Sequence, residues 1–209
     1  MNAPSVGDPA PDATLVDPSG EPVRLSTFWR EGPAVVVFLR YFGCPFCQAQ
    51  VVALRRDEAR FRSAGAQIGL VGHGHPEEAR SFASDKRLPF PLVLDPDRSA
   101  YRSYGLVQGR ALQVLGPKVV LPWLRAEVSA ETRQHGLKGG SFFQMPGTFV
   151  IDGGGVVRLT GGLVRLAYLS RHVADAPSNE LILRLVGELA GRSNGRGAPA
   201  AAEGPVDQK

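Results

Sequence analysis

The chain has 209 residues, of which 43% are hydrophobic, so it is long enough for one domain with its own core. No apolar run approaches the roughly 18 residues that a membrane-spanning helix needs, and the first residues lack the basic and then apolar pattern of a signal peptide. We therefore expect a cytoplasmic protein without membrane association. The net charge of +4 comes from scattered Lys and Arg that acids largely offset, which argues against a nucleic-acid partner.

The first 40 residues predict a small hairpin followed by a buried strand. Two short extended pieces flank the turn Asp17–Gly20, and prolines restrict the entry to the first of them. Residues 26–29 have room for one helical turn. The apolar run Ala34–Leu39 is short, rich in Val and bounded by Gly32–Pro33, so it predicts a central strand.

The only two cysteines, Cys44 and Cys47, lie between this strand and a segment with helical spacing. Residues three apart on the first turn of a helix share a face, so the two sulfurs can meet in a disulfide. A helix N-terminus favours thiolate over thiol, and Pro45 suits a first turn because its missing N–H costs nothing there. We therefore predict a thioredoxin-like redox motif, with Cys44 as the attacking thiolate and Cys47 as the resolving thiol. The alternatives are half of a metal site and two structural cysteines, but zinc usually takes four ligands and no second cysteine pair exists.

Beyond the motif, alternating strand and helix patterns predict an α/β fold. The expected elements are a helix ending at Gly65, a strand at Gln67–Val71, a helix at Pro76–Asp85, a strand at Pro89–Leu94 and a short helix at Ser99–Tyr104. Residues 106–141 show little pattern and are longer than a usual connection, so we interpret them as an insertion that lies over the site.

The pattern resumes with a strand at Thr148–Ile151, a turn at 152–155, a return strand at Val156–Thr160 and a helix at Leu181–Ala190. We expect one domain over residues 1–190, with a central mixed sheet flanked by helices, and a disordered tail at 191–209.

Four side chains near the motif are candidates for supporting it. Arg40 is placed to lower the pKa of Cys44 by its charge, although either Arg40 or Tyr41 should point into the packing because side chains alternate along a strand. His73 and His75 follow the strand predicted at Gln67–Val71, at the same edge of the sheet as the cysteine motif. One interpretation is that His73 stabilises the thiolate or transfers a proton; the other is an ordinary loop histidine. No further cluster of ligands accompanies the two histidines, so we expect no metal site.

Three segments together resemble the AhpC/TSA superfamily, and within it the peroxiredoxin-like proteins that carry C-x-x-C on a thioredoxin fold. They are residues 42–47, residues 88–97 with Tyr104–Gly105, and residues 145–152. The resemblance covers about residues 5–190 and implies a thioredoxin-like fold.

Matched position by position, the resemblance makes Cys44 the attacking cysteine and Cys47 the second cysteine of the pair. Pro146, after Met145, matches the cis-proline that lies against the active-site sulfur. A cis X–Pro bond costs little and exposes backbone for an extended substrate to pair with, so we expect it here, with a trans turn proline as the alternative. His172 and Asp175 also resemble a recurring family segment, and stabilisation of a local turn is the simplest interpretation.

The chain also departs from the typical peroxiredoxin pattern. Typical members carry a Thr three residues before the attacking cysteine and a Pro seven before it, where this chain has Tyr41 and Val37. They also carry an Arg near the start of the late strand, where this chain has Met145 and Pro146. Because the Thr and the Arg polarise the peroxide O–O bond, the resemblance alone does not imply efficient peroxidase activity.

The resemblance implies a thiol oxidoreductase with antioxidant activity. The Cys44 thiolate attacks a peroxide or a disulfide, Cys47 closes an intramolecular disulfide, and an external thioredoxin or glutathione system reduces it, without a cofactor. Within enzymes the alternative is a disulfide reductase or a specialised pathway reductase. An alternative of another class is a redox-responsive binding module whose partner surface is formed by residues 106–141. The oligomeric state stays open, a homodimer included.

Overall fold

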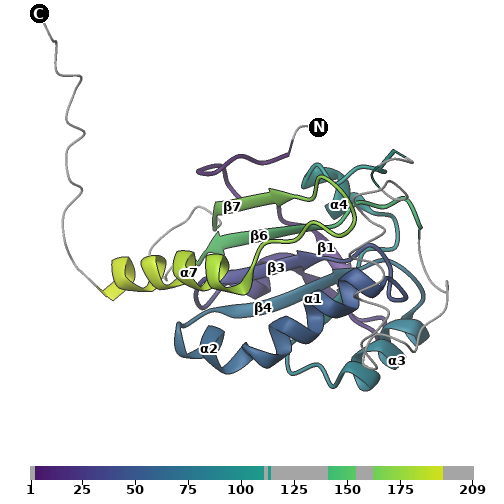
Figure 1. The fold of residues 1–209 in the computed structure, drawn as a ribbon, viewed down its shortest axis with the longest axis horizontal. Coiled ribbons are helices and arrows are strands. Elements are labelled where there is room, and N and C mark those ends of the chain that lie inside the picture. Colours follow the sequence, from purple (N-terminus) through teal and green to yellow (C-terminus); the bar gives the residue numbers. More distant parts are fainter. Residues whose placement is uncertain (1–2, 111–112, 114–140, 154–161, 195–209) are drawn as a thin grey trace, which may run out of the picture.

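A seven-stranded mixed sheet lies at the centre of the fold, in the order β2-β1-β5-β4-β3-β6-β7 (Figure 1). The computed structural model describes residues 3–110, 113, 141–153 and 162–194. The strands are β1 (Thr14–Val16), β2 (Pro22–Arg24), β3 (Ala34–Phe38), β4 (Gln67–Gly72), β5 (Leu92–Leu94), β6 (Gly147–Asp152) and β7 (Leu163–Leu169). Strands β3, β4 and β5 are parallel to one another, whereas β1, β2, β6 and β7 pair antiparallel with their neighbours.

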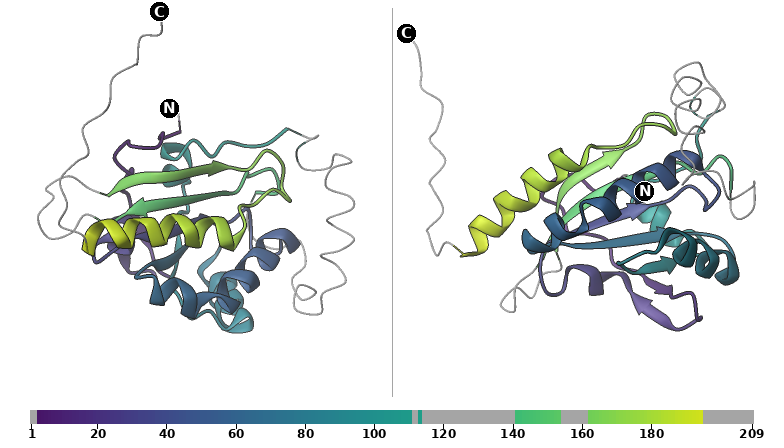
Figure 2. Two further views of the ribbon diagram at one scale, coloured as in Figure 1. Left: turned by 60° about the vertical axis from the view of Figure 1, so that its left-hand side comes forward. Right: turned by 60° about the horizontal axis from the view of Figure 1, so that its bottom comes forward.

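Helices cover both faces of this sheet. They are η1 (Leu25–Trp29), α1 (Pro45–Arg56), α2 (Glu58–Ser63), α3 (Pro76–Lys86), α4 (Ser99–Ser103) and α7 (Asn179–Asn194). The helices α1, α2, α3 and α7 share one face, and η1 and α4 pack on the other (Figure 2). This arrangement confirms the predicted mixed sheet flanked by helices. No helix in the described ranges is long and apolar enough to cross a membrane.

Strand β3 is buried on both faces because it lies between two separate cores. Val35 and Val37 point into the core beneath α1, α2, α3 and α7, whereas Val36 and Phe38 point into the core beneath η1 and α4. Alternate side chains of a strand face opposite sides of its sheet, so an uninterrupted apolar run is what such a strand requires. The apolar segment of the sequence therefore gives the strand that ends next to the cysteine motif.

The N-terminal segment contacts strands toward both edges of the sheet. Gly7 donates its backbone N–H to the carbonyl of Val164 over 2.8 Å, and Val164 donates in return to Asp8 over 2.9 Å, so this segment begins beside β7. Only a few residues later β1 pairs with β2 in the predicted hairpin, and β1 also pairs with β5. The first 16 residues thus run from one edge strand toward the opposite edge.

Some predicted boundaries differ from the structure, and other predictions fall outside the described residues. The strand that pairs with β6 is β7, at Leu163–Leu169, whereas the return strand expected at Val156–Thr160 lies outside the described residues. Helix α7 ends at Asn194 instead of Ala190. Most of the expected insertion at 106–141, and the tail from residue 195, also lie outside the described residues.

Candidate active site

The cysteine motif lies where the central strand meets the first helix. Cys44 is the N-cap residue of α1, in an extended conformation with φ −71° and ψ 117°, and its N–H donates to the carbonyl of Tyr41 over 3.2 Å. Pro45 is the first helical residue, and Cys47 follows on the same turn. Both cysteines are buried free thiols. The motif is therefore at the carboxyl end of the parallel strands, where the chain order placed it.

The Cys44 thiol is strongly activated. Burial alone would raise its pKa, but the hydrogen bond from the Cys47 thiol, the Arg40 charge and the backbone N–H groups of Cys47 and Phe46 lower the pKa of Cys44 to about 6. Conversely, the hydrogen bond to Cys44 and burial raise the pKa of Cys47 well above its ordinary value. At neutral pH the pair therefore holds one thiolate, on Cys44, and one thiol, on Cys47.

Arg40 contacts both sulfurs. Its Nη1 lies 3.6 Å from Cys44 Sγ, and its backbone N–H points at Cys47 Sγ over 3.4 Å. The guanidinium lies beside the rings of both Tyr41 and Phe142, 5.2 Å and 5.1 Å from their centroids. Burial and then the Cys44 charge raise the pKa of Tyr41 to about 12, so Tyr41 remains a neutral wall of the site. Of the two residues that alternation left open, Arg40 reaches the sulfurs.

Two backbone carbonyls hold the Arg40 side chain in this position. Its Nε donates to the carbonyl of Gln144 over 3.1 Å, and its Nη2 donates to the carbonyl of Phe142. Gln144 is itself buried, and its side chain donates to the carbonyl of Leu106 over 2.9 Å. Phe142 and Gln144 are not among the predicted site residues because they act through main-chain carbonyls, which no residue pattern encodes.

His73 is buried at the end of β4, and neither sulfur is among its described contacts. Its ring packs edge-on against Tyr101, with centroids 5.2 Å apart. Burial and then the charge of Arg98 lower the pKa of His73 to about 4, although a hydrogen bond with the Arg40 backbone opposes this shift. His73 is therefore neutral at pH 7 and contributes no positive charge to the thiolate.

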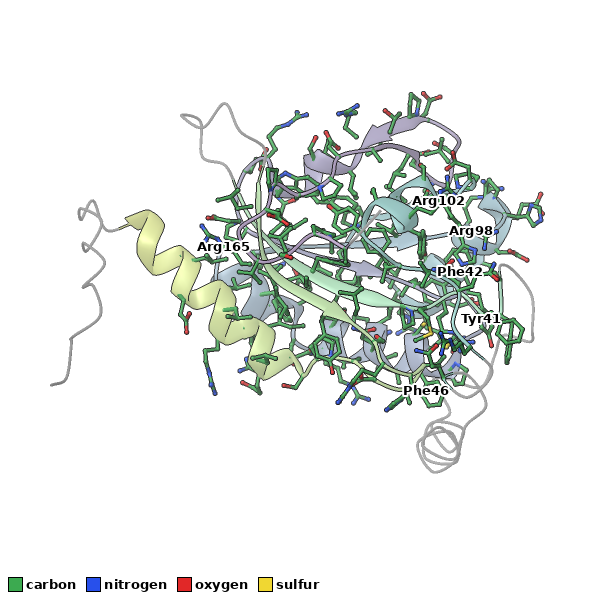
Figure 3. The ribbon with its side chains drawn as sticks, turned by 90° about the horizontal axis from the view of Figure 1, so that it is seen from above. Tyr41, Phe42, Phe46, Arg98, Arg102 and Arg165 are labelled. Atoms are coloured by element: carbon green, nitrogen blue, oxygen red, sulfur yellow. The ribbon has the colours of Figure 1, made fainter. Side chains whose placement is uncertain are left out.

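Gln48 fixes the turn that presents Cys44. This buried side chain donates through Nε2 to the carbonyl of Phe42 over 2.9 Å. Figure 3 shows Tyr41, Phe42 and Phe46 together at one end of the sheet, with Arg165 at the opposite end. The aromatic side chains around the motif thus surround a site with little exposure to water.

Pro146 does not adopt the expected cis conformation. The described residues contain no cis peptide bond, so the Met145–Pro146 bond is trans. Met145 is buried, and its N–H donates to the carbonyl of Val107 over 3.2 Å, in a short pairing of the segments around 108 and 144. This pairing directs the chain into β6 while the Met145–Pro146 bond stays trans.

A pocket of about 420 Å³ lies beside α1, and we call it the α1 groove. Its walls are one face of α1, Pro146 and residues 173–180. Cys47 is part of the lining, whereas Cys44 is not. The groove therefore adjoins the second cysteine of the pair, which is itself buried.

Asp175 stabilises a local turn, as its sequence context suggested. Its carboxylate accepts hydrogen bonds from the Tyr168 hydroxyl over 2.5 Å and from the Arg171 backbone N–H over 2.9 Å, and its own N–H donates to the carbonyl of His172. The turn forms part of the wall of the α1 groove.

Within the described residues there is no group of three or more His, Cys, Asp and Glu side chains that could hold a metal.

Comparison with solved structures identifies the fold. Peroxidoxin BcpB of Mycobacterium tuberculosis superposes with a TM-score of 0.60 at 23% identity, covering 88% of this chain and 96% of that one. A peroxiredoxin-like protein from Aquifex aeolicus superposes with a TM-score of 0.63 at 17% identity, covering 90% of each chain. The fold is therefore thioredoxin-like, of the peroxiredoxin type.

The sequence comparisons then give the family. The AhpC/TSA family profile matches residues 6–160, and the chain belongs to this family of thiol oxidoreductases. Prostamide/prostaglandin F synthase of Salmo salar is 32% identical over 146 residues, which are 66% of this chain and 68% of that protein. Chloroplastic peroxiredoxin Q of Sedum lineare is 33% identical over 100 residues, which are 48% of this chain and 53% of that protein.

Proposed function

We propose that the protein is a thiol-dependent peroxide reductase that cycles between a Cys44/Cys47 dithiol and an intramolecular disulfide. The observation that carries the proposal is the Arg40 guanidinium, 3.6 Å from Cys44 Sγ, beside a thiol pair with opposite pKa shifts. It supplies from the end of β3 a positive charge that typical peroxiredoxins take from the late strand. The site thus combines a stabilised nucleophile with a neutral resolving thiol.

In the first step the Cys44 thiolate attacks the terminal oxygen of a hydroperoxide. The O–O bond breaks, the leaving oxygen takes a proton and departs as an alcohol or water, and Cys44 becomes a sulfenic acid. Cys47 then attacks Cys44 Sγ, so that the S–S bond forms and the S–O bond breaks. The sulfenic oxygen leaves as water with the proton of Cys47. Two external thiols restore the dithiol and become a disulfide themselves.

Complete burial of Cys44 favours a small oxidant, because a protein disulfide cannot reach its sulfur without movement of the surrounding segments. The Cys44 pKa of about 6 gives about ten thiolates for every thiol at pH 7, so the nucleophile is ready before the oxidant arrives.

The test follows hydrogen peroxide consumption with excess reductant, and intact mass after single additions, in wild type, Cys44→Ser and Cys47→Ser. We expect many turnovers in wild type, a sulfenic acid on Cys44 in Cys47→Ser, and no peroxide reaction in Cys44→Ser. Stoichiometric oxidation without turnover would instead indicate a redox-responsive binding module. A Cys47→Ser protein that forms no sulfenic acid would rule out the peroxidase cycle.

A second candidate is a specialised reductase of one small molecule, and the likeness to prostamide/prostaglandin F synthase favours it. The absence of the typical Thr, replaced by Tyr41, also fits a site that is not tuned to hydrogen peroxide. Comparison of hydrogen peroxide with organic peroxides and with disulfides of small molecules separates the two. A rate constant for hydrogen peroxide far below that for one organic substrate would favour the specialised reductase.

A further inference from the structure

We propose that Gln144 is a positioning residue for the nucleophile: its buried side-chain amide holds the main-chain carbonyl that directs the Arg40 guanidinium at Cys44 Sγ. The inference deepens the proposed function and rests on it in one respect, the role of Cys44 as the attacking thiolate. Neither sulfur is among the described hydrogen-bond partners of Gln144, so this residue acts through Arg40.

Gln144 uses its main chain and its side chain in different hydrogen bonds. Its carbonyl accepts the Nε–H of Arg40 over 3.1 Å, and its Nε2 donates to the carbonyl of Leu106 over 2.9 Å. The carbonyl oxygens of Met145 and Val107 lie 3.3 Å and 3.5 Å from the same nitrogen. Only the amino end of the amide can donate to these carbonyls, so they determine how the side chain is oriented. The position of the amide in turn restricts the position of the carbonyl that Arg40 contacts.

The main chain leaves this task to the side chain. The pairing of the segments around 108 and 144 uses main-chain groups of the residues on either side of Gln144. Alternate residues of an antiparallel pair turn their own N–H and C=O away from the partner. Those of Gln144 bond the carbonyl of Ser141, over 3.0 Å, and the Arg40 side chain. The side-chain amide therefore ties residue 144 itself to the paired segment.

Burial makes this link firm. Gln144 is 2% exposed, so water cannot easily replace the partners of its amide. Leu106 is buried too, and its N–H donates to the carbonyl of Tyr101 over 2.8 Å, just beyond α4. A buried carbonyl that loses its donor is costly, so the amide and the Leu106 carbonyl keep each other in place. The support of Arg40 therefore begins in the core beneath η1 and α4.

The position of Arg40 matters because its charge opposes the effect of burial on Cys44. Burial raises the pKa of Cys44, whereas the hydrogen bond from Cys47 and then the Arg40 charge lower it, to about 6. Within the described residues, the other titratable groups beside this sulfur are the Cys47 thiol and the Tyr41 hydroxyl, and the pKa of each is raised, so both are neutral at pH 7. Displacement of the guanidinium should therefore appear directly in the pH profile of Cys44.

The experiment measures the rate of Cys44 alkylation by iodoacetamide against pH, in the Cys47→Ser background so that a single thiol reports. Gln144→Met keeps an unbranched side chain of similar length that donates no hydrogen bond. We expect the midpoint of its profile to lie about one pH unit above that of the parent, so that alkylation at the parent's midpoint slows about fivefold. An unchanged midpoint would overturn the inference. If Gln144→Met does not fold, Gln144→Asn, whose amide is one methylene shorter, takes its place with the same expected direction.

Two controls separate positioning from a general loss of stability. Tyr104→Phe removes another hydrogen bond to a main-chain carbonyl, that of Pro11, away from the site, and should leave the midpoint unchanged. In the Arg40→Met background, Gln144→Met should shift the midpoint little further, because the group that it positions is gone. Equal shifts with and without Arg40, or a matching shift in Tyr104→Phe, would contradict the role of Gln144.

The measurement uses no peroxide, so its outcome is separate from that of the proposed function. A wild-type protein that does not turn over peroxide would end the peroxidase proposal and leave the effect of Gln144 on the acidity of Cys44 intact. Peroxide turnover together with an unchanged midpoint in Gln144→Met would end this inference alone.

Discussion

The hydroxyl of Tyr101 donates a 2.6 Å hydrogen bond to the backbone carbonyl of Leu39, one residue before Arg40. The same hydroxyl lies 3.0 Å from the carbonyl of Val71, which also accepts the N–H of Leu39. A side chain of α4 thus fixes the ends of β3 and β4 at the point where the chain leaves the sheet for the active site. The position of Arg40 therefore depends on a residue from the opposite face of the sheet.

Tyr101→Phe should lower stability and loosen Arg40 at the same time. Loss of the hydroxyl leaves two buried carbonyls with fewer donors, so we expect a cost of about 1–2 kcal/mol in urea unfolding. We also expect slower alkylation of Cys44 at pH 7. Tyr104→Phe is the control, because the Tyr104 hydroxyl bonds the carbonyl of Pro11, away from the site. It should lose stability without changing Cys44, and equal alkylation rates in both variants would contradict the proposed link.

Arg40→Met should raise the pKa of Cys44 from about 6 toward the ordinary range of a thiol. The charge that opposes burial is lost, and burial alone raises the pKa. The pH dependence of iodoacetamide alkylation in the Cys47→Ser background, with the thiolate absorbance as a second measure, reports the shift. Arg40→Lys keeps the charge but not the bonds to the Phe142 and Gln144 carbonyls, so it should give an intermediate pKa. An unchanged pKa in Arg40→Met would show that the remaining hydrogen bonds, from residue 47 and from the backbone N–H groups of the helix N-terminus, suffice without the Arg40 charge.

His73 should make the protein acid-sensitive. Its pKa is about 4 in the fold, against about 6.5 in an unfolded chain, so between these values the unfolded state binds the proton that the folded state does not. Stability should therefore be complete above pH 6.5 and fall as the pH drops toward 4, by up to about 3 kcal/mol. Urea unfolding across this range should show a smaller loss in His73→Gln.

Gly69→Ala should be strongly destabilising. A Cβ at Gly69 would lie 2.3 Å from ring carbons of Phe28, so η1 would have to move away from the sheet. Overpacking of this kind costs about 1–3 kcal/mol. A Cβ added at Gly187 of α7 would have no heavy atom within 4 Å. Gly187→Ala should therefore stabilise the protein by about 0.5–1 kcal/mol through helix propensity. Thermal unfolding of the two variants should shift in opposite directions, and a stable Gly69→Ala protein would mean that Phe28 is not fixed.

The elements that the sequence predicted best are those with a local signal. Examples are the continuous apolar run of β3, the turn at Asp17–Gly20 and the proline at the start of α3. In each case the residues of the element themselves predict the structure that forms. Strand β7 was missed because it is an edge strand whose side chains are mostly half-buried, so its sequence has little alternation. The prediction of a cis bond before Pro146 was wrong. The path of this segment depends on its pairing around residue 108, which the family resemblance does not encode.

The site was predictable in its sulfurs and only in part elsewhere. Cys44 and Cys47 lie between a strand and a helix at the spacing typical of a redox pair, and Arg40 could be inferred from its proximity in sequence. The neutrality of His73 could not, because it follows from burial against Tyr101 and from the charge of Arg98. The charge of a polar side chain near the site thus depends on its burial and on the charges that the fold brings close to it, and not on residue type alone.

The N-terminal segment has a consequence for the order in which the chain can fold during synthesis. Its residues near Gly7 pair with Val164, near the far end of the domain, so this segment completes its hydrogen bonds only after β7 has been synthesised. Contacts this distant in sequence slow folding, because the entropy of loop closure is spent before they form. A nascent chain halted before β7 would hold its two thiols in an incomplete sheet. Redox competence should therefore arise only after β7 has been synthesised.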